Sequence, residues 1–296
     1  MPKITAALVK ELREKTGAGM MDCKKALSAN NSNIEESIDW LRTKGLAAAT
    51  KKAGRLASEG LIGIAIENGV GALVEVNSET DFVARNEKFQ EFVSRLAKLA
   101  ISSDGDINKL KREQYSNDGS DSVEQKIIEM VATVGENIQL RRVAVIKSGT
   151  GLLSSYIHNR QGDGLGKIGV LVSFQNEKNS PELEEFAKQI AMHIAATKPR
   201  SISRHDLDPT LIEREKNVLT QQAQETGKPD NIIDKMVEGR IRKFYEEVCL
   251  LEQTFALDGE TKIADVISNK SKNIGGSIAL AEFAFFILGE GIEKKE

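Results

Sequence analysis

Aromatic side chains are scarce in this chain: they make up 5% of its 296 residues and include a single tryptophan. Sites that stack nucleobases or sugars depend on such rings, so a stacking platform is not expected. The formal net charge is only −3, from 41 Lys and Arg and 44 Asp and Glu residues. This balance provides no general attraction to a phosphate backbone, and we expect no direct nucleic-acid partner.

Cysteines and long apolar runs are also rare. The two cysteines, Cys23 and Cys249, are far apart and belong to no CxxC pair, which argues against a disulfide scaffold and against a zinc site. No apolar run reaches the roughly 18 residues of a membrane helix. The charged, amphipathic residues 1–14 do not resemble a secretory signal. We therefore expect a cytoplasmic protein that does not contact a membrane.

The patterns that mark common enzyme sites are missing as well. The glycine-rich stretch Gly162–Lys167 fails the GxxxxGK[ST] spacing of a phosphate loop, because three residues separate Gly162 from Gly166. No HExxH pair and no GxSxG elbow occur, and His193 lies on an apolar helix face typical of a core histidine. A Ser-His-Asp set assembled by folding stays open. We expect a binding protein with no catalytic residue, metal or cofactor.

The first 55 residues show the apolar spacing of helices. Asn33 and Glu36 have the spacing of a helix N-terminal cap, and Gly45 is the expected C-terminal cap. A charged connector is expected at residues 51–58. We predict three short helices here, at residues 5–15, from about residue 21, and at residues 34–44.

From residue 61 the apolar spacing changes to the alternation of strands. Asn68-Gly69 has the chemistry of a tight hairpin turn. The order strand, polar turn, helix at residues 72–101 recurs at residues 169–196, so we predict two similar lobes. The expected strands are residues 61–66, 72–76, 138–146, 152–157, 168–174, 254–257 and 274–288, and the expected helices are residues 87–101, 124–133 and 181–196.

Residues 210–248 depart from this plan. Apolar residues from Ile232 to Val248 recur at steps of three and four, and Gly227-Lys228-Pro229 precedes them, which indicates an antiparallel helical hairpin. The predicted fold class is α+β with antiparallel sheets. The predicted domains are a three-helix domain with its connector at 1–55, a first core lobe at 56–146, a second core lobe at 147–209 and 250–288, an inserted hairpin at 210–249 and a tail at 289–296.

The candidate site is the stretch Thr80, Asp81, Phe82 and Val83, between a predicted strand and a predicted helix. A carboxylate beside a large ring at such a junction suits insertion into another protein, because the ring fills a pocket and the carboxylate competes for a donor or cation. A simpler interpretation is that Thr80 or Asp81 caps the helix while Phe82 packs into the domain's own core.

Several stretches of the sequence resemble the translation elongation factor Ts family. The most specific are residues 12–27 (LREKTGAGMMDCKKAL) and 75–83 (EVNSETDFV). Shorter stretches that support the resemblance are residues 135–138 (GENI) with Arg141-Arg142, 190–193 (IAMH), 235–240 (KMVEGR) and 289–293 (GEGIE). The resemblance runs nearly from end to end of the chain.

The resemblance implies a guanine-nucleotide exchange factor that binds GDP-loaded elongation factor Tu and performs no covalent chemistry. It would promote GDP release by displacing the Mg²⁺ and phosphate-loop contacts, which allows GTP loading during translation. The resemblance also implies that the N-terminal domain is like a ubiquitin-associated domain. Two alternatives stay open: an adaptor that holds a helix of another partner, and an enzyme whose site residues are distant in sequence. The oligomeric state of the free protein is left open.

The resemblance also assigns partner contacts to particular residues. It implies that Phe82 wedges between helices of the partner beside its nucleotide site, and that Asp81 reorders hydrogen bonds there. Arg13, Met20 and Met21 match positions that touch the partner's GTPase domain, although one of the two methionines is alternatively expected in the three-helix core. His158 lies near an expected contact of the second lobe.

Overall fold

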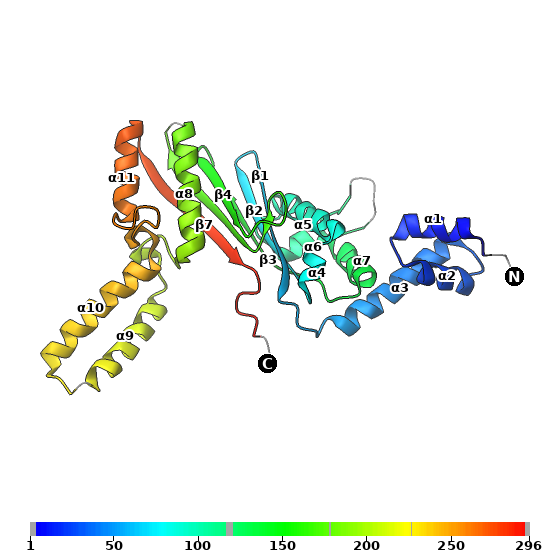
Figure 1. Ribbon diagram of the computed structural model, residues 1–296, viewed down its shortest axis with the longest axis horizontal. Helices are drawn as coiled ribbons and strands as arrows, with labels where there is room; N and C mark the ends of the chain where they lie inside the picture. The colour runs from blue at the N-terminus through cyan, green and yellow to red at the C-terminus, as the bar shows by residue number, and fades with distance from the viewer. Residues whose placement is uncertain (1–3, 117–120, 178, 226, 294–296) are drawn as a thin grey trace.

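The structure is a computed structural model that describes residues 4–116, 121–177, 179–225 and 227–293. The outermost residues of the predicted N-terminal domain and tail, 1–3 and 294–296, lie outside this part. The molecule is elongated, with three N-terminal helices at one end, two sheets in the middle and two long helices at the other end (Figure 1). The predicted α+β class with antiparallel sheets is confirmed.

Three helices form the N-terminal part: α1 (Ala6–Thr16), α2 (Met20–Ala29) and α3 (Ile34–Lys52). Their buried core is small and contains Leu12, Cys23, Ala26 and Leu27. Gly17 ends α1 with a positive φ of 64°, and the Asn33 side chain accepts a hydrogen bond from the Glu36 amide, as the cap spacing predicts.

The predicted end of the third helix at Gly45 is wrong. Gly45 is buried within α3, which continues to Lys52, so the connector begins at residue 53. A Cβ atom at Gly45 would lie 3.5 Å from the Cβ of Ala132 in α7 (Val123–Val134). The small residue therefore serves close helix packing, a contact that local sequence does not reveal, and the helix is not broken there.

The first sheet contains β1 (Glu59–Glu67), β2 (Val70–Ser78) and β3 (Gln139–Lys147), with the short β5 (Leu165–Gly166) beside β1. Asn68 and Gly69 both have positive φ, at 50° and 74°, as the predicted hairpin turn requires. The helices of this half are α4 (Asp81–Ala84), α5 (Glu87–Ala100), α6 (Ile107–Arg112) and α7.

The second sheet has the order β4 (Leu152–His158), β6 (Ile168–Asn176), β7 (Ile278–Ile287). It is covered by α8 (Pro181–Thr197) and α11 (Ile263–Ile274). The expected strand at residues 254–257 is wrong, because Thr254 makes only an isolated bridge to Lys262. Helix α11 was not predicted. The glycine-rich turn before β6 contributes β5 to the other sheet.

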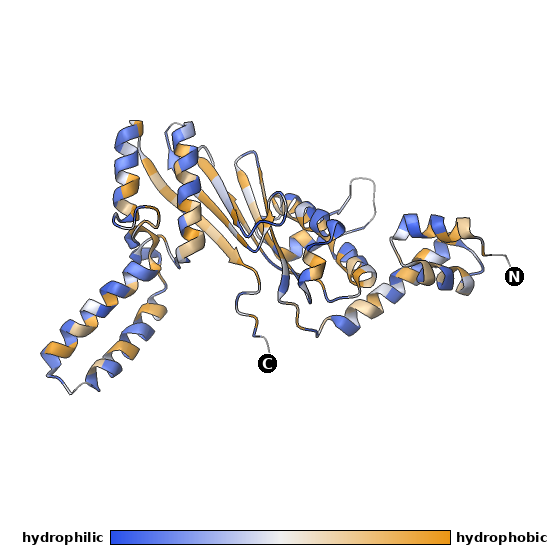
Figure 2. Cartoon of the chain, viewed as in Figure 1, coloured by the Kyte–Doolittle hydropathy of each residue, from blue (hydrophilic) through white to orange (hydrophobic). Residues whose placement is uncertain are grey.

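The two sheets pack face to face between the helices, which produces four layers (Figure 1). Alternate residues of a strand point to opposite faces, so Val74 of β2 faces the helices while Leu73 faces the second sheet. Gly71 and Gly169 allow close approach, since a Cβ at either would lie within 3 Å of a side chain from the opposite sheet. Figure 2 shows hydrophobic residues concentrated in the strands and mixed with hydrophilic ones along the helices.

Helices α9 (Pro209–Gln224) and α10 (Asp230–Val248) lie side by side and extend away from the sheets (Figure 1). Their shared core is narrow and contains Ala223, Ile233 and Val237. Short 3₁₀ turns flank the pair at Arg204–Asp206 and Leu250–Glu252. Among the helices of the described residues, none has the combined length and apolar character that crossing a bilayer requires.

Candidate functional site

The most exposed large hydrophobic side chain of the described residues is Phe82, which is 76% exposed. It lies in the short helix α4, between β2 and α5. Burying such a ring typically stabilises a fold by about 1.5–3 kcal/mol. Because the Phe82 ring is exposed, it does not contribute most of this stabilisation. The interpretation that Phe82 packs into its own core is therefore wrong, and the ring is available to a partner.

The residues that follow Phe82 anchor α4 to the first half of the molecule. Val83 and Ala84 are buried in the core beneath the first sheet. The Gln90 side-chain amide donates to the Ala84 carbonyl oxygen over 3.0 Å. The backbone of α4 is thus held from below while Phe82 points outward from it. We call residues 80–83 the Phe82 tip.

Asp81 forms a surface ion pair, with 2.8 Å between its Oδ2 and the Nη2 of Arg85. The Arg85 side chain is exposed and the Asp81 side chain is 45% exposed, and surface pairs of this kind contribute about 0–1 kcal/mol. The Asp81 carboxylate can therefore exchange Arg85 for a cation or donor of another molecule at little cost.

Thr80 occupies the cap position of α4, but its side chain makes no capping hydrogen bond. Its hydroxyl instead donates to Oε1 of Glu136 over 2.6 Å. The Asp81 carboxylate pairs with Arg85, and Asn86 caps α5. The alternative in which Thr80 or Asp81 caps the following helix is therefore wrong. Glu136 is a residue of the site that sequence reasoning missed, although it lies in the GENI stretch on which the family resemblance partly rests.

The N-terminal candidates lie on exposed surfaces of α1 and α2. Arg13 is exposed, and Met20 and Met21 are 61% and 64% exposed. The expectation that one methionine is buried in the three-helix core is wrong. Methionine packs adaptably against varied surfaces, so this pair provides an apolar contact area. Figure 1 shows α2, which carries the pair, at one end of the molecule and α4 nearer the middle.

His158 lies at the end of β4, in the second sheet, and is exposed. Its Nδ1 is 3.1 Å from the hydroxyl oxygen of Tyr156. The structure thus places the predicted residues in three separate areas: Phe82 tip, N-terminal helices and second sheet. A partner that contacts all three must cover a broad surface.

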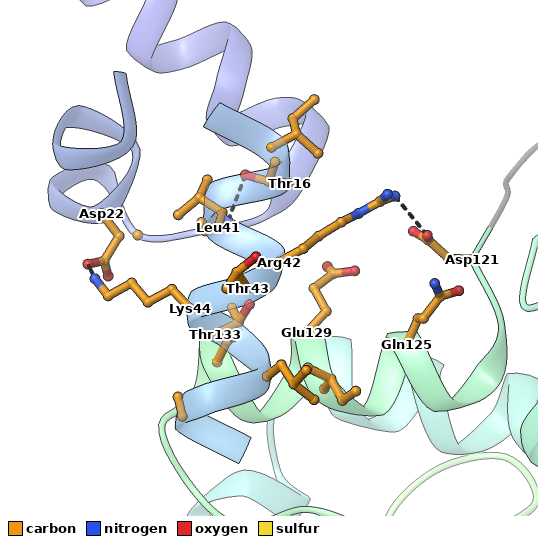
Figure 3. Close-up of a pocket in the computed structure, with 18 of the residues that line it drawn as sticks. Thr16, Asp22, Leu41, Arg42, Thr43, Lys44, Asp121, Gln125, Glu129 and Thr133 are labelled. Atoms are coloured by element: carbon orange, nitrogen blue, oxygen red, sulfur yellow. Dashed lines mark hydrogen bonds and ion pairs between the residues drawn. The ribbon is translucent and has the colours of Figure 1, made fainter. Parts of the chain in front are cut away.

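A cleft of about 510 Å³ lies between the N-terminal helices and α7 (Figure 3). Ion pairs border it, from Arg42 to Asp121 at 2.9 Å and from Lys44 to Asp22 at 2.5 Å. The hydrogen bond from the Lys44 ammonium lowers the pKa of the Asp22 carboxyl below its ordinary value. None of the predicted site residues lines this cleft.

The buried titratable groups have structural partners. The Nε2 atom of His193 is 3.0 Å from Oε1 of Gln253, and its Nδ1 atom accepts a hydrogen bond from the backbone N–H of Ala256. The prediction that His193 is a core histidine is therefore confirmed. Burial lowers the pKa of His193 and raises the pKa values of the Cys23 and Cys249 thiols. Within the described residues, no three His, Cys, Asp or Glu side chains gather as metal ligands.

Comparison with known proteins adds to this geometry. The sequence profile of the family described as Elongation factor TS matches residues 79–290. The chain is 55% identical to Elongation factor Ts of Rhodospirillum rubrum over 296 residues, which is 100% of this chain and 96% of the relative. It is 53% identical to Elongation factor Ts of Rickettsia bellii over 294 residues, 99% of this chain and 94% of the relative.

Proposed function

The chain belongs to the elongation factor Ts family and so has a role in translation elongation, and from this premise we propose that it is a guanine-nucleotide exchange factor for elongation factor Tu. It binds the GDP-loaded partner, displaces the contacts of Mg²⁺ and of the phosphate loop, and leaves the site open to GTP. The factor itself makes and breaks no covalent bond.

The observation that carries this proposal is the exposure of Phe82 on an anchored helical turn. Because the backbone that carries the ring is anchored, it need not be ordered on binding, so less conformational entropy is lost. Asp81, with its weak ion pair to Arg85, supplies a carboxylate that can take a new donor.

Binding and nucleotide release are coupled reciprocally. A factor that binds the nucleotide-free partner more tightly weakens the nucleotide, and the nucleotide weakens the factor to the same extent. A 10⁴-fold weakening requires about 5.5 kcal/mol of differential binding, more than one ring provides. Arg13, Met20 and Met21 on the N-terminal helices and His158 on the second sheet would supply further contacts.

The remaining assignments belong to the same proposal. The N-terminal domain, residues 1–55, is a ubiquitin-associated-like module that binds the partner's GTPase domain. The core lobes are residues 56–146 and residues 147–209 with 250–288, the inserted hairpin is 210–249, and the tail is 289–296. The protein acts in the cytoplasm, where translation occurs. The small apolar core of α1–α3 and the separate cores under each sheet support this division.

The test is release of fluorescent GDP from elongation factor Tu in the presence of wild-type protein or of Phe82→Ala. Truncating a hot-spot ring typically costs 2 kcal/mol or more, so we expect stimulated release to fall roughly 30-fold. Because the ring is exposed, the free energy of unfolding should change by less than about 0.5 kcal/mol. Leu257→Ala, at another exposed large hydrophobic residue, is the matched control and should retain full activity.

Two results would contradict the proposal. If wild-type protein leaves GDP release unchanged, the molecule is not an exchange factor, and binding without release would favour an adaptor. If folded Phe82→Ala stimulates release as well as wild type, exchange does not depend on the ring.

A further inference from the structure

We propose that Glu136 is a positioning residue that holds the Phe82 tip in the orientation needed for exchange. The expected effect of Glu136 on nucleotide exchange rests on the proposed function. Its effect on the tip can be measured in the free protein. Glu136 follows α7 and is distant from the tip in sequence. The fold places its carboxylate at the first residues of the tip.

The Glu136 carboxylate accepts three hydrogen bonds from Glu79 and Thr80, where the chain enters the tip. Its Oε2 accepts the backbone N–H groups of Glu79 over 3.1 Å and of Thr80 over 3.0 Å. Its Oε1 accepts the Thr80 hydroxyl over 2.6 Å. Hydrogen bonds to an ionised acceptor are about twice as strong as neutral ones, so one side chain fixes both the backbone and the side chain at the start of the tip.

The interaction is reciprocal, because the carboxylate of Glu79 accepts the backbone N–H of Asn137 over 2.6 Å. We call these mutual contacts the Glu79–Glu136 clasp. The Asn137 side chain is buried and donates to the Arg55 carbonyl oxygen over 2.7 Å. The clasp therefore also connects the tip to the segment that leads from the N-terminal helices.

Helix α4 needs this support because it has only four residues. A single turn is not stable by itself, since nucleating a helix fixes several torsion angles for few hydrogen bonds. Val83 and Ala84 anchor its far side in the core, and Glu136 anchors its near side. Phe82 lies between these anchors and, being exposed, has no packing of its own to set its direction.

Two substitutions of Glu136 separate geometry from charge. Glu136→Ala removes the two oxygens that accept all three hydrogen bonds. It should lower the maximal rate of stimulated GDP release about tenfold, because a misplacement of about 1 Å can cost up to about 10²-fold in rate. Glu136→Gln keeps a carbonyl oxygen for the two N–H groups, and its amide can donate to the Thr80 hydroxyl, which can reverse its role. It should retain most of the wild-type rate. Glu124→Gln, at an exposed carboxylate of α7, is the control for loss of charge.

A positioning role predicts which kinetic quantity changes. The concentration of factor at half-maximal stimulation should stay within about twofold, because the N-terminal contacts are intact, while the maximal rate falls. In the Phe82→Ala background, Glu136→Ala should have little further effect, since the group that it positions is gone. An equal loss in both backgrounds, or full activity of folded Glu136→Ala, would overturn the inference.

Hydrogen exchange of the free protein provides a test that needs no partner. The backbone amides of Glu79 and Thr80 should exchange hydrogen at least tenfold faster in Glu136→Ala than in wild type. The exchange rates of peptides from α5 should be the same in both proteins. If hydrogen exchange at these two amides is the same in Glu136→Ala as in wild type, the clasp is overturned, even if the protein does stimulate nucleotide release. If the wild-type protein does not stimulate GDP release from the partner but the clasp protects these two amides, the proposed function is contradicted and the clasp stands. Thr80→Val, which removes one of the three bonds, gives a milder variant if Glu136→Ala does not fold.

Discussion

Strands β2 and β6 are alike in length and pairing, but different segments follow them. Each has nine residues, lies between two antiparallel neighbours, and shows a register shift after its sixth residue, at Glu75/Val76 and at Ser173/Phe174. After β2, residues 79–86, which include the Phe82 tip and α4, precede the next long helix, α5. After β6, which ends at Asn176, the long helix α8 begins at Pro181 with Ser180 as its cap, and no short helix precedes it among the described residues. The Phe82 tip is thus a local difference between two strands of similar length and pairing.

The two halves also differ at the register shift itself. Glu75 of β2 is fully buried and pairs with Arg141 at 3.0 Å and with Arg142. It also accepts the Gly289 amide over 2.9 Å, which holds the segment after β7 against the first sheet. The equivalent residue of β6 is the buried, uncharged Ser173. The comparison shows that one half carries an ionic anchor at a position where its counterpart carries a small polar residue.

The largest effect on stability is expected from removing this anchor. Glu75→Ala removes the buried carboxylate from two partly buried guanidinium groups, of which, among the described residues, only Arg142 keeps another ion pair, with Glu290 at 3.3 Å. Breaking a buried pair costs about 3 kcal/mol. Ser173→Ala, at the equivalent position, should cost less than about 1 kcal/mol. Urea denaturation of both variants measures the difference. Equal losses would show that the two halves do not differ in the way the contacts indicate.

A smaller effect tests the feature that the halves share. Gly71 and Gly169 are the second residues of β2 and β6, and each receives a leucine of the other sheet, Leu171 or Leu73. An added methyl group must displace those side chains, which costs about 1–3 kcal/mol, so both alanine variants should lose about 2 kcal/mol.

The control for these glycines is Gly239→Ala in α10, where an added Cβ meets no atom within 4 Å. It should stabilise the protein by about 0.5–1 kcal/mol, since alanine favours helix. Thermal unfolding measures all three variants. If the losses of stability in Gly71→Ala and Gly169→Ala differ strongly, the two sheets are not equivalent at these positions.

The smallest effect concerns pH. All three histidines lie after residue 150, and burial lowers the pKa of His193 below its ordinary value of about 6.5. The unfolded chain therefore takes up a proton more readily, so the stability from neutral His193 is complete above pH 6.5 and is lost as pH falls. The free energy of unfolding should decline only while pH falls from about 6.5 to the lowered pKa of folded His193, with a slope no greater than about 1.4 kcal/mol per pH unit.

Denaturation of wild type and His193→Gln between pH 5 and pH 7.5 checks this dependence. The variant should lose most of the slope, and His158→Gln, at an exposed histidine, is the control. A slope that survives His193→Gln would place the acid-sensitive group elsewhere.

Elements with strong local patterns were predictable. The hairpin turn at Asn68-Gly69, the cap at Asn33 and the apolar stripe of α5 follow from backbone preference and periodicity. The predicted end of α3 at Gly45 was wrong because its packing partner, Ala132, is distant in sequence. Helix α11 was missed because its buried residues, Ile263 and Ile267, are few and are surrounded by polar ones.

The candidate site was predictable in part. The motif around Phe82 was found from its residue types, but whether the ring is buried or exposed depended on the anchoring of Val83 and Ala84. The three bonds of Glu136 were beyond sequence reasoning, because they join residues 56 or 57 positions apart in the chain.

By itself, the order of residues determined the family, the alternation of strands and helices and the position of the aromatic-acidic pair, because these depend on neighbours along the chain. Only the tertiary structure decided that Phe82 faces solvent and that Glu136 grips the segment before it. The direction of a side chain on a four-residue helix is set by contacts with distant segments, and such contacts exist only once the chain has folded.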